Sequence, residues 1–143
     1  MTISVIVPCF NEEESIPLFH EAMEAVKYQV RDQFEYIFVN DGSTDRTLAV
    51  LRELSSHCPD VHYLSFSRNF GKEAALYAGL QEASGDFVTV MDVDLQDPPE
   101  LLIEMKAMLD SNPELDCVGT RRTTREGEPP IRSFFANLFY KLI

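Results

Sequence analysis

Two aspartates separated by a single residue, Asp92 and Asp94, form the segment of this sequence best suited to chemistry. They directly follow an apolar run typical of a buried strand, and in extended backbone alternate side chains point to the same side. Two carboxylates held in this way repel each other unless a cation lies between them. Gln96 offers another oxygen ligand, so the segment is a candidate site for Mg²⁺ or Mn²⁺. From this segment alone, a solvated acidic turn is the alternative.

Polar residues also follow three other apolar runs. Phe10 could stack on a base while Asn11 and Glu12 hydrogen-bond to the base or the ribose. Asp41 stands before a glycine that would let the backbone approach a ligand, and its carboxylate could bind a base or ribose unless it only caps a turn. Lys72 opens a helical segment whose free amides suit a diphosphate, with an ordinary surface lysine as the alternative. The spacing is not that of a P-loop.

The hydrophobic pattern predicts the elements that would bring these side chains together. The predicted strands are residues 3–7, 36–39, 61–64, 86–91 and 116–119. The predicted helices are residues 13–30, 43–54, 71–83 and 97–109, with Ser43 or Thr44 capping the second and Asp97 the fourth. This alternation of continuous apolar strands with helices predicts an α/β fold whose parallel sheet is covered on both faces. Ligands bind beyond the carboxyl ends of such strands, where all the segments above lie.

Composition narrows the class of protein. A chain of 143 residues forms a single domain with a sizeable core, and its net charge of −12 argues against a nucleic-acid partner. Residues 1–116 carry 7 Lys and Arg against 22 Asp and Glu, whereas residues 117–143 carry 5 against 2. An acidic body with a basic tail suggests that the tail has its own partner. Three cysteines without a C-x-x-C pair favour a reduced compartment over a disulfide framework.

The tail has the pattern of an amphipathic helix. From residue 131 to residue 142, apolar side chains recur with i, i+3, i+4, i+7 spacing. Such a helix would lie in a membrane interface, or pack on the sheet or on a second subunit of a homo-oligomer. Arginines at 121, 122 and 125 favour anionic headgroups or a phosphate. No run is long enough to span a bilayer and no signal peptide is expected, so we expect peripheral attachment to the cytoplasmic side of a membrane.

The motifs together resemble those of a known family. Pro-Cys-Phe-Asn-Glu at 8–12, Asn-Asp-Gly-Ser-Thr-Asp at 40–45, Ser-Arg-Asn-Phe-Gly-Lys at 67–72 and Asp-Val-Asp-Leu-Gln-Asp-Pro-Pro-Glu at 92–100 have the order and spacing seen in family 2 glycosyltransferases. The branch that the sequence most resembles contains dolichol-phosphate mannose synthase and undecaprenyl-phosphate glucosyltransferases. The resemblance implies a GT-A fold, a UDP- or GDP-sugar donor, a divalent metal and a polyprenyl-phosphate acceptor. Since family members are usually about twice as long, we expect a truncated chain.

The resemblance also assigns roles to single residues. Residues 1–120 would form the nucleotide-sugar-binding core, and 121–143 an acceptor-side basic loop with the amphipathic helix. The expected donor-binding residues are Pro8, Phe10, Asn11, Glu12, Asp41, Ser43, Lys72, Asp92, Val93 and Asp94. The expected metal ligands are Asp92, Asp94 and Gln96. Arg121 and Arg132 match arginines near the acceptor phosphate, and with Asp92 and Asp94 they form the expected catalytic set.

The chemistry is consistent with an anionic acceptor. Transfer to a hydroxyl group requires a general base, which the sequence does not clearly supply, whereas a polyprenyl phosphate is already a nucleophile. A single in-line attack would invert the anomeric carbon. A glycosyltransferase acting on a polysaccharide hydroxyl and a non-catalytic nucleotide-sugar-binding fragment are the alternatives. A receiver-type signalling module would need a carboxylate at the end of its third strand, but residues 65–67 of this chain contain none. A sugar nucleotidyltransferase would usually have a Gly-rich basic loop after the first strand, and residues 9–12 do not form one.

Overall fold

The structure is a computed structural model that describes residues 1–120. Within these residues, strands and helices alternate strictly along the chain, as the hydrophobic pattern predicts. The elements are β1 (Thr2–Cys9), α1 (Ser15–Val30), β2 (Gln33–Asn40), α2 (Thr47–His57), β3 (Val61–Ser65), α3 (Lys72–Glu82), β4 (Phe87–Val90) and α4 (Leu101–Ser111). The expected roles of Arg121 and Arg132 and the expected helix at 131–143 lie outside the described residues.

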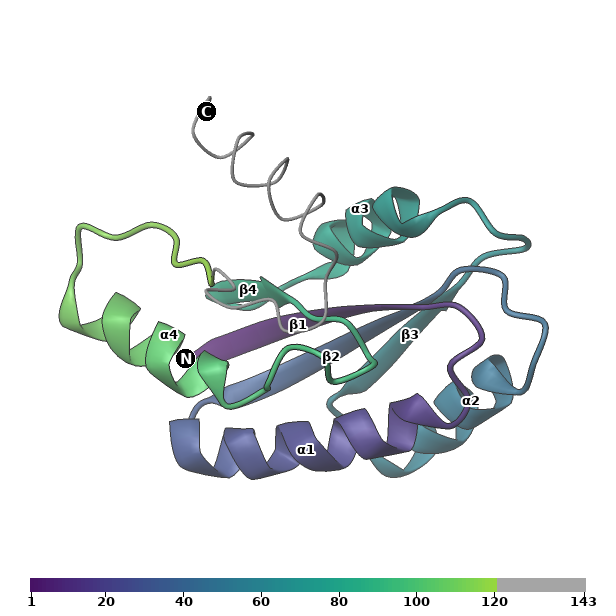
Figure 1. Ribbon diagram of the computed structural model, residues 1–143, viewed down its shortest axis with the longest axis horizontal. Coiled ribbons are helices and arrows are strands. Elements are labelled where there is room, and N and C mark those ends of the chain that lie inside the picture. Colours follow the sequence, from purple (N-terminus) through teal and green to yellow (C-terminus); the bar gives the residue numbers. More distant parts are fainter. Residues whose placement is uncertain (121–143) are drawn as a thin grey trace, which may run out of the picture.

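All strand pairs in the described sheet are parallel, and the strand order is β3-β2-β1-β4 (Figure 1). β1 is central: Ile6 pairs with Ile37 of β2 on one side and with Val90 of β4 on the other. After β1 the chain therefore adds β2 and β3 on one side of β1, and then crosses to the other side of β1 to form β4. At such a crossover point the loops after the neighbouring strands diverge, which leaves a crevice between the end of β1 and the end of β4.

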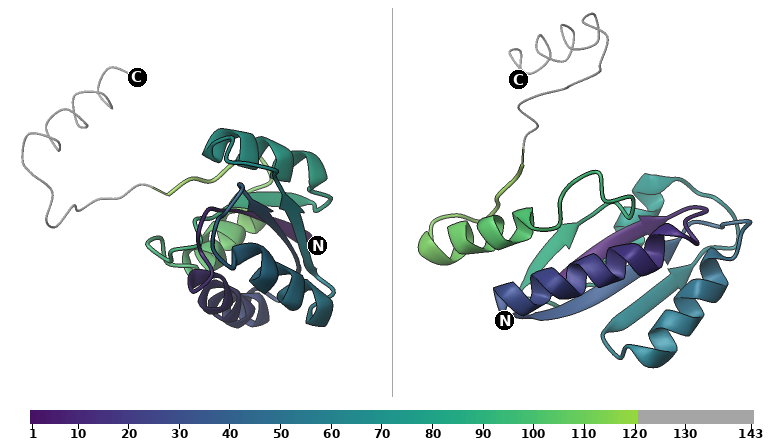
Figure 2. Two further views of the ribbon diagram at one scale, coloured as in Figure 1. Left: turned by 90° about the vertical axis from the view of Figure 1, so that its right-hand side faces the viewer. Right: turned by 60° about the horizontal axis from the view of Figure 1, so that its bottom comes forward.

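Helices cover both faces of the sheet, with α1, α2 and α4 on one face and α3 on the other (Figures 1 and 2). On the first face the Phe19 and Phe38 rings pack edge to face at 6.1 Å, and both side chains are fully buried. On the second face α3 lies close to the sheet because it carries Gly79, where a Cβ would come within 2.4 Å of the Ile6 side chain. This close contact sets the start of α3 beside the ends of β1 and β2.

The start of α2 differs from the prediction. The helix begins at Thr47, and Asp45 Oδ1 accepts a hydrogen bond from the Thr47 amide at 2.9 Å, so neither Ser43 nor Thr44 acts as the cap. Both side chains are engaged elsewhere: Ser43 Oγ accepts the Asn11 amide at 2.9 Å, and the Thr44 hydroxyl donates to Asn11 Oδ1 at 3.3 Å. Cross-links between the loops after β1 and β2 therefore use the polar side chains that the local sequence offers as helix caps.

The other boundaries shift for local reasons. α1 begins at Ser15, two residues later than predicted, and α4 begins at Leu101 rather than at Asp97. Before α4 the chain makes a tight turn in which the Leu101 amide donates to the Pro98 carbonyl at 3.1 Å. The predicted strand at 116–119 is not a strand. Its apolar residues are the exposed Cys117 and the partly buried Val118, which bury too little surface to hold a strand in place.

Candidate functional site

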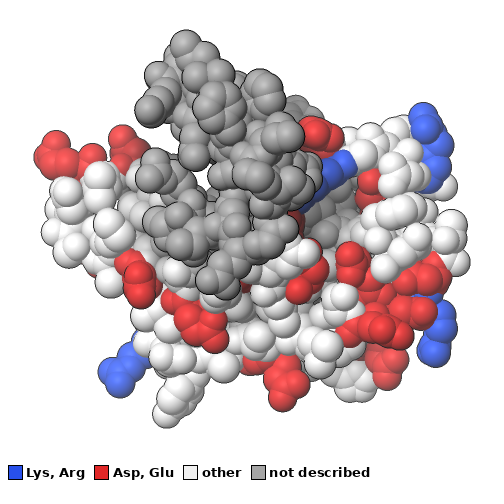
Figure 3. All heavy atoms as spheres, viewed as in Figure 1, with Lys and Arg blue, Asp and Glu red and all other residues white. Residues whose placement is uncertain are grey.

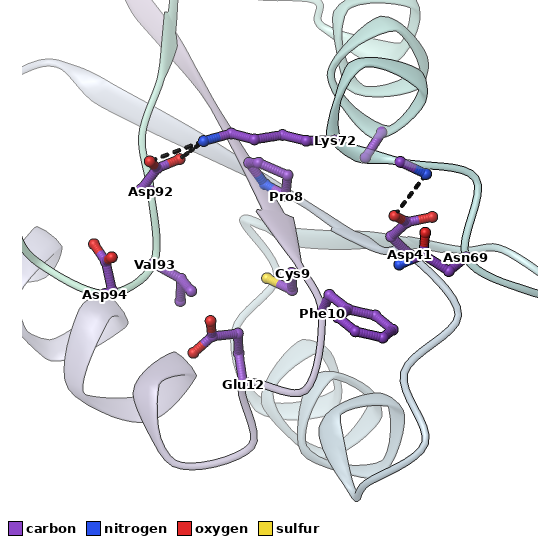
Figure 4. A pocket seen from close by; sticks show the side chains of 12 residues that line it. Pro8, Cys9, Phe10, Glu12, Asp41, Asn69, Lys72, Asp92, Val93 and Asp94 are labelled. Carbon is purple, nitrogen blue, oxygen red and sulfur yellow. Dashed lines mark hydrogen bonds and ion pairs between the residues drawn. The ribbon is translucent and has the colours of Figure 1, made fainter.

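A pocket of about 360 Å³ opens where the carboxyl ends of β1, β2 and β4 meet the start of α3 (Figure 4). The lining residues are Pro8, Cys9, Phe10, Glu12, Asp41, Asn69, Gly71, Lys72, Ala75, Asp92, Val93 and Asp94. Eight of the ten residues expected to bind a donor are in this set, and they come from four separate segments of the chain. Asn11, Ser43 and Gln96 do not line the pocket.

The segment after β1 forms the middle of the pocket. The Phe10 ring is 45% exposed, whereas Cys9 is buried and its thiol donates to the Val7 carbonyl. Burial, assisted by the nearby Glu12 charge, raises the pKa of Cys9. The thiol therefore stays protonated, and Cys9 lines the pocket without reacting. Glu12 accepts the Ser15 hydroxyl at 2.7 Å at the start of α1. This segment therefore offers an accessible aromatic face beside a carboxylate held by its own helix.

Asp41 joins the end of β2 to the start of α3. The residue is only 4% exposed, and its two carboxylate oxygens accept the amides of Phe70 at 2.7 Å and Gly71 at 3.0 Å. The sequence suggested that free amides here would suit a diphosphate; two of them are already bound by Asp41. Gly42 has a φ of +67°, and a Cβ there would lie 2.2 Å from the carbonyl carbon of Arg68. The two loops are therefore locked against each other.

The Asp-x-Asp segment lies at the opposite side of the pocket. β4 ends at Val90 and the chain turns at Val93 and Asp94, so the two aspartates are not part of the strand; both line the pocket, and Val93 between them is 4% exposed. Asp94 Oδ1 accepts the Gln96 amide at 3.1 Å. This turn redirects the chain before the Gln96 side chain could join the two carboxylates, which leaves Gln96 outside the pocket.

Lys72 forms an ion pair with Asp92 across the pocket. Its Nζ lies 2.6 Å from one carboxylate oxygen and 2.9 Å from the other (Figure 4). The first turn of α3 therefore contributes the cation, and the turn after β4 contributes the anion. Across residues 1–120 no three His, Cys, Asp or Glu side chains are grouped so that they could hold a metal ion by themselves.

Some pocket residues were not expected to bind the donor. Cys9, Asn69 and Gly71 lie within the motifs but were assigned no role, and Ala75, in α3, lies outside every motif. Arg68 belongs to the same motif as Lys72 but does not line the pocket, and its guanidinium stacks over the Phe70 ring at 4.2 Å. Membership of a motif is therefore a better guide to the loop than to which of its side chains faces the pocket.

The described residues on the face viewed in Figure 1 are predominantly acidic where they are charged. Figure 3 shows Asp and Glu side chains spread widely over the face viewed in Figure 1, with few Lys or Arg side chains among them. This distribution agrees with the net charge of −12. An anionic ligand that enters the pocket therefore needs positive charge close to where it binds.

A parallel sheet with a ligand-sized pocket at its crossover point defines an α/β protein of the nucleotide-binding, Rossmann-like class. Comparison with known proteins identifies the group within that class. The chain belongs to glycosyl transferase family 2, whose family model matches residues 4–142. The resemblance that the motifs predict is thus confirmed.

Individual relatives agree with this assignment. The bactoprenol glucosyl transferase of Shigella phage SfV is 42% identical over 142 residues, which cover 99% of this chain and 46% of the relative. The mannosyltransferase PcManGT from Pyrobaculum calidifontis, solved in complex with GDP-Man and Mn²⁺, has a TM-score of 0.67 and 28% identity over 82% of this chain and 35% of its own. S. aureus TarS in complex with UDP-GlcNAc has a TM-score of 0.65 and 25% identity over 86% and 38%.

These likenesses confirm the GT-A fold predicted from the sequence. The chain spans less than half the length of the curated relatives that it matches. In the part of the chain that the structure describes, no helix combines the length and the apolar character needed to cross a bilayer.

Proposed function

We propose that this chain is the donor-binding part of an inverting glycosyltransferase that moves a hexose from a UDP- or GDP-sugar to a polyprenyl phosphate. The observation that carries the proposal is the convergence of four motif segments on one pocket in a family 2 chain. A relative named for transfer to bactoprenol supports a polyprenyl-phosphate acceptor. Such an acceptor would bring the protein to the cytoplasmic face of a membrane.

The pocket's layout suggests how a donor would lie. Asp41 and Asn69 lie on one side of the pocket together with the Phe10 ring, and Asp92 lies on the other side (Figure 4). The exposed Phe10 ring would contact the base, and the diphosphate would run toward Lys72. This direction places the only lysine among the described lining residues where the donor's charge is greatest.

The carboxylates at the far side fit a divalent cation. Mg²⁺ in phosphate-binding sites uses one or two protein carboxylates and takes its remaining ligands from phosphate oxygens and water. Asp92 and Asp94, both exposed at the pocket edge, match that donor set, while a cage built from protein ligands alone would not be expected here. When bound, Mg²⁺ or Mn²⁺ would supply Lewis-acid neutralisation of the departing nucleoside diphosphate.

The hydrogen bonds of Asp41 and Glu12 support an acceptor that needs no general base. Asp41 already accepts two backbone amides, and Glu12 accepts the Ser15 hydroxyl. Both oxygens of Asp41 are therefore occupied, which does not favour a base at that position, and a phosphate acceptor arrives already ionised. We propose Arg121 and Arg132, which follow the described core, as the groups that hold the acceptor phosphate.

Calorimetry tests the donor site. The chain is titrated with UDP-glucose, GDP-mannose and ATP, each with and without Mn²⁺, and we expect binding of one nucleotide sugar that strengthens with the metal. Asp94→Asn keeps the hydrogen bond to Gln96 but removes the charge, so it should abolish the metal-dependent part and leave folding intact. Glu114→Ala, which removes an exposed carboxylate outside the pocket, is the control. Absence of binding by any nucleotide sugar would overturn the proposal.

A further inference from the structure

Asp92, one of the two carboxylates proposed to bind the metal, already forms an ion pair with Lys72. Both oxygens of Asp92 lie within 2.9 Å of Lys72 Nζ, inside the pocket where the donor diphosphate and the metal would meet. This inference rests on the proposed function, because it concerns the order of events at the same donor site.

The Lys72–Asp92 ion pair is built for exchange rather than for stability. The two side chains are 55% and 44% exposed, and exposed ion pairs contribute little to folding. Lys106 provides a contrast within the same chain: its side chain is 10% exposed and bridges Asp32 and Asp110, as expected of a structural ion pair. Water and ligands can therefore reach both side chains of the Lys72–Asp92 ion pair in the pocket.

We propose that Lys72 is a resident cation that neutralises Asp92 until the donor and the divalent metal arrive together. On binding, Nζ leaves Asp92 for a phosphate oxygen of the donor, and Asp92 becomes available to the metal. The lysine suits this movement because its ammonium is carried on a flexible four-carbon chain. Its position in the first turn of α3 keeps Nζ within reach of the pocket in both states.

The exchange makes metal and donor binding cooperative. A metal that arrives alone must displace an ammonium from Asp92 and then lie beside that positive charge, with Asp94 as the remaining carboxylate of the segment. A diphosphate that arrives with the metal gives Lys72 a new anionic partner and so removes both penalties. Because coupling between two ligands is reciprocal, the metal strengthens donor binding by the same factor.

Removal of the lysine charge tests the exchange directly. Free Mn²⁺ is followed by electron paramagnetic resonance as the 143-residue chain is titrated without nucleotide and then with UDP or GDP. We expect Lys72→Met to bind Mn²⁺ alone roughly fivefold more tightly than the wild type, the upper range for losing an exposed ion pair. The nucleotide should then strengthen Mn²⁺ binding less in Lys72→Met than in the wild type.

Two further variants serve as controls. Lys72→Arg keeps the positive charge beside Asp92 and should show no gain in affinity for Mn²⁺ alone. Arg52→Met removes one exposed cation from α2, away from the pocket, and should leave Mn²⁺ affinity unchanged. Circular dichroism checks folding, and Lys72→Gln replaces Lys72→Met if the latter does not fold.

The outcomes separate this inference from the proposed function. If the wild type binds Mn²⁺ with nucleotide but Lys72→Met shows equal or weaker affinity for Mn²⁺ alone, the exchange is refuted and the donor site stands. An equal gain in Arg52→Met would also refute it, because the effect would then come from net charge. If the wild type binds neither nucleotide nor Mn²⁺ under any condition, the donor site itself is refuted.

Discussion

Replacement of Asp41 by asparagine should destabilise the whole fold as well as weaken ligand binding. The Asp41 carboxylate is buried and accepts two backbone amides, one with each oxygen, at the start of α3. Asparagine has nearly the same shape but a single acceptor oxygen. Its NH₂ group would face one of the two backbone N–H donors, so that donor would lose its partner.

The expected loss follows from these contacts. A hydrogen bond to a charged group contributes about 1.5–3 kcal/mol, and a carboxylate near a helix N-terminus gains about 0.3–1 kcal/mol from the helix dipole. Asp41→Asn retains one amide hydrogen bond without its charge and forfeits the other. We therefore expect the free energy of unfolding to fall by about 3 kcal/mol, a large share of the roughly 5–15 kcal/mol typical of a domain.

Urea denaturation followed by circular dichroism measures this loss. Asp86→Asn is the matched control, because exposed Asp86 accepts, within residues 1–120, a single hydrogen bond, from the Thr2 amide at 2.8 Å, which an asparagine oxygen can still accept. The control should lose less than about 1 kcal/mol. If Asp41→Asn is no less stable than Asp86→Asn but binds nucleotide more weakly, Asp41 acts as a ligand contact and the structural argument is wrong.

Other residues give sharp expectations of the same kind. Gly42→Ala should cost at least about 2 kcal/mol in urea unfolding, because its Cβ would collide with the Arg68 backbone, 2.2 Å away, at a φ of +67°. Lys106→Met should cost about 2 kcal/mol in the same assay, since it removes one of the two cations that contact the largely buried Asp32 within residues 1–120 and leaves the N-terminal ammonium. Burial alone would raise the pKa of Asp32, but hydrogen bonds from Lys106 and the N-terminus hold this pKa below its usual range. The stability gained from Asp32 is therefore complete above about pH 4 and should be lost as the pH falls further. In Lys106→Met the melting temperature should fall less steeply with decreasing pH, as measured by thermal unfolding at a series of pH values.

The hydrophobic pattern was sufficient to predict the architecture. β2 contains four consecutive apolar, buried residues, at 36–39, and such a run fits a sheet covered on both faces. Parallel pairing then places every strand-end motif at one edge, which is why eight expected residues meet at the pocket. The predicted strand at 116–119 failed because two apolar residues between polar neighbours are too weak a pattern to specify a strand.

Partner choice within the site could not be predicted in the same way. The sequence places Asp41, Lys72 and Asp92 at one sheet edge, but Asp41 finds its partners 29 and 30 residues away, and Lys72 finds Asp92 20 residues away. Several pairings satisfy the same set of charges, and the one adopted depends on how closely α3 packs on the sheet. Gly42 and Gly79 permit that close packing, and its consequences appear only in three dimensions.

The charges in the pocket explain why a cation should accompany the donor. Among the described residues the lining contains four carboxylates, those of Glu12, Asp41, Asp92 and Asp94, but a single Lys or Arg side chain, that of Lys72. Backbone amides satisfy Asp41, and Lys72 satisfies Asp92. A diphosphate adds further negative charge, and one ammonium cannot balance both the diphosphate and Asp92. The metal dependence that we expect therefore follows from the balance of charge across the whole pocket, more than from the spacing of the two aspartates after β4.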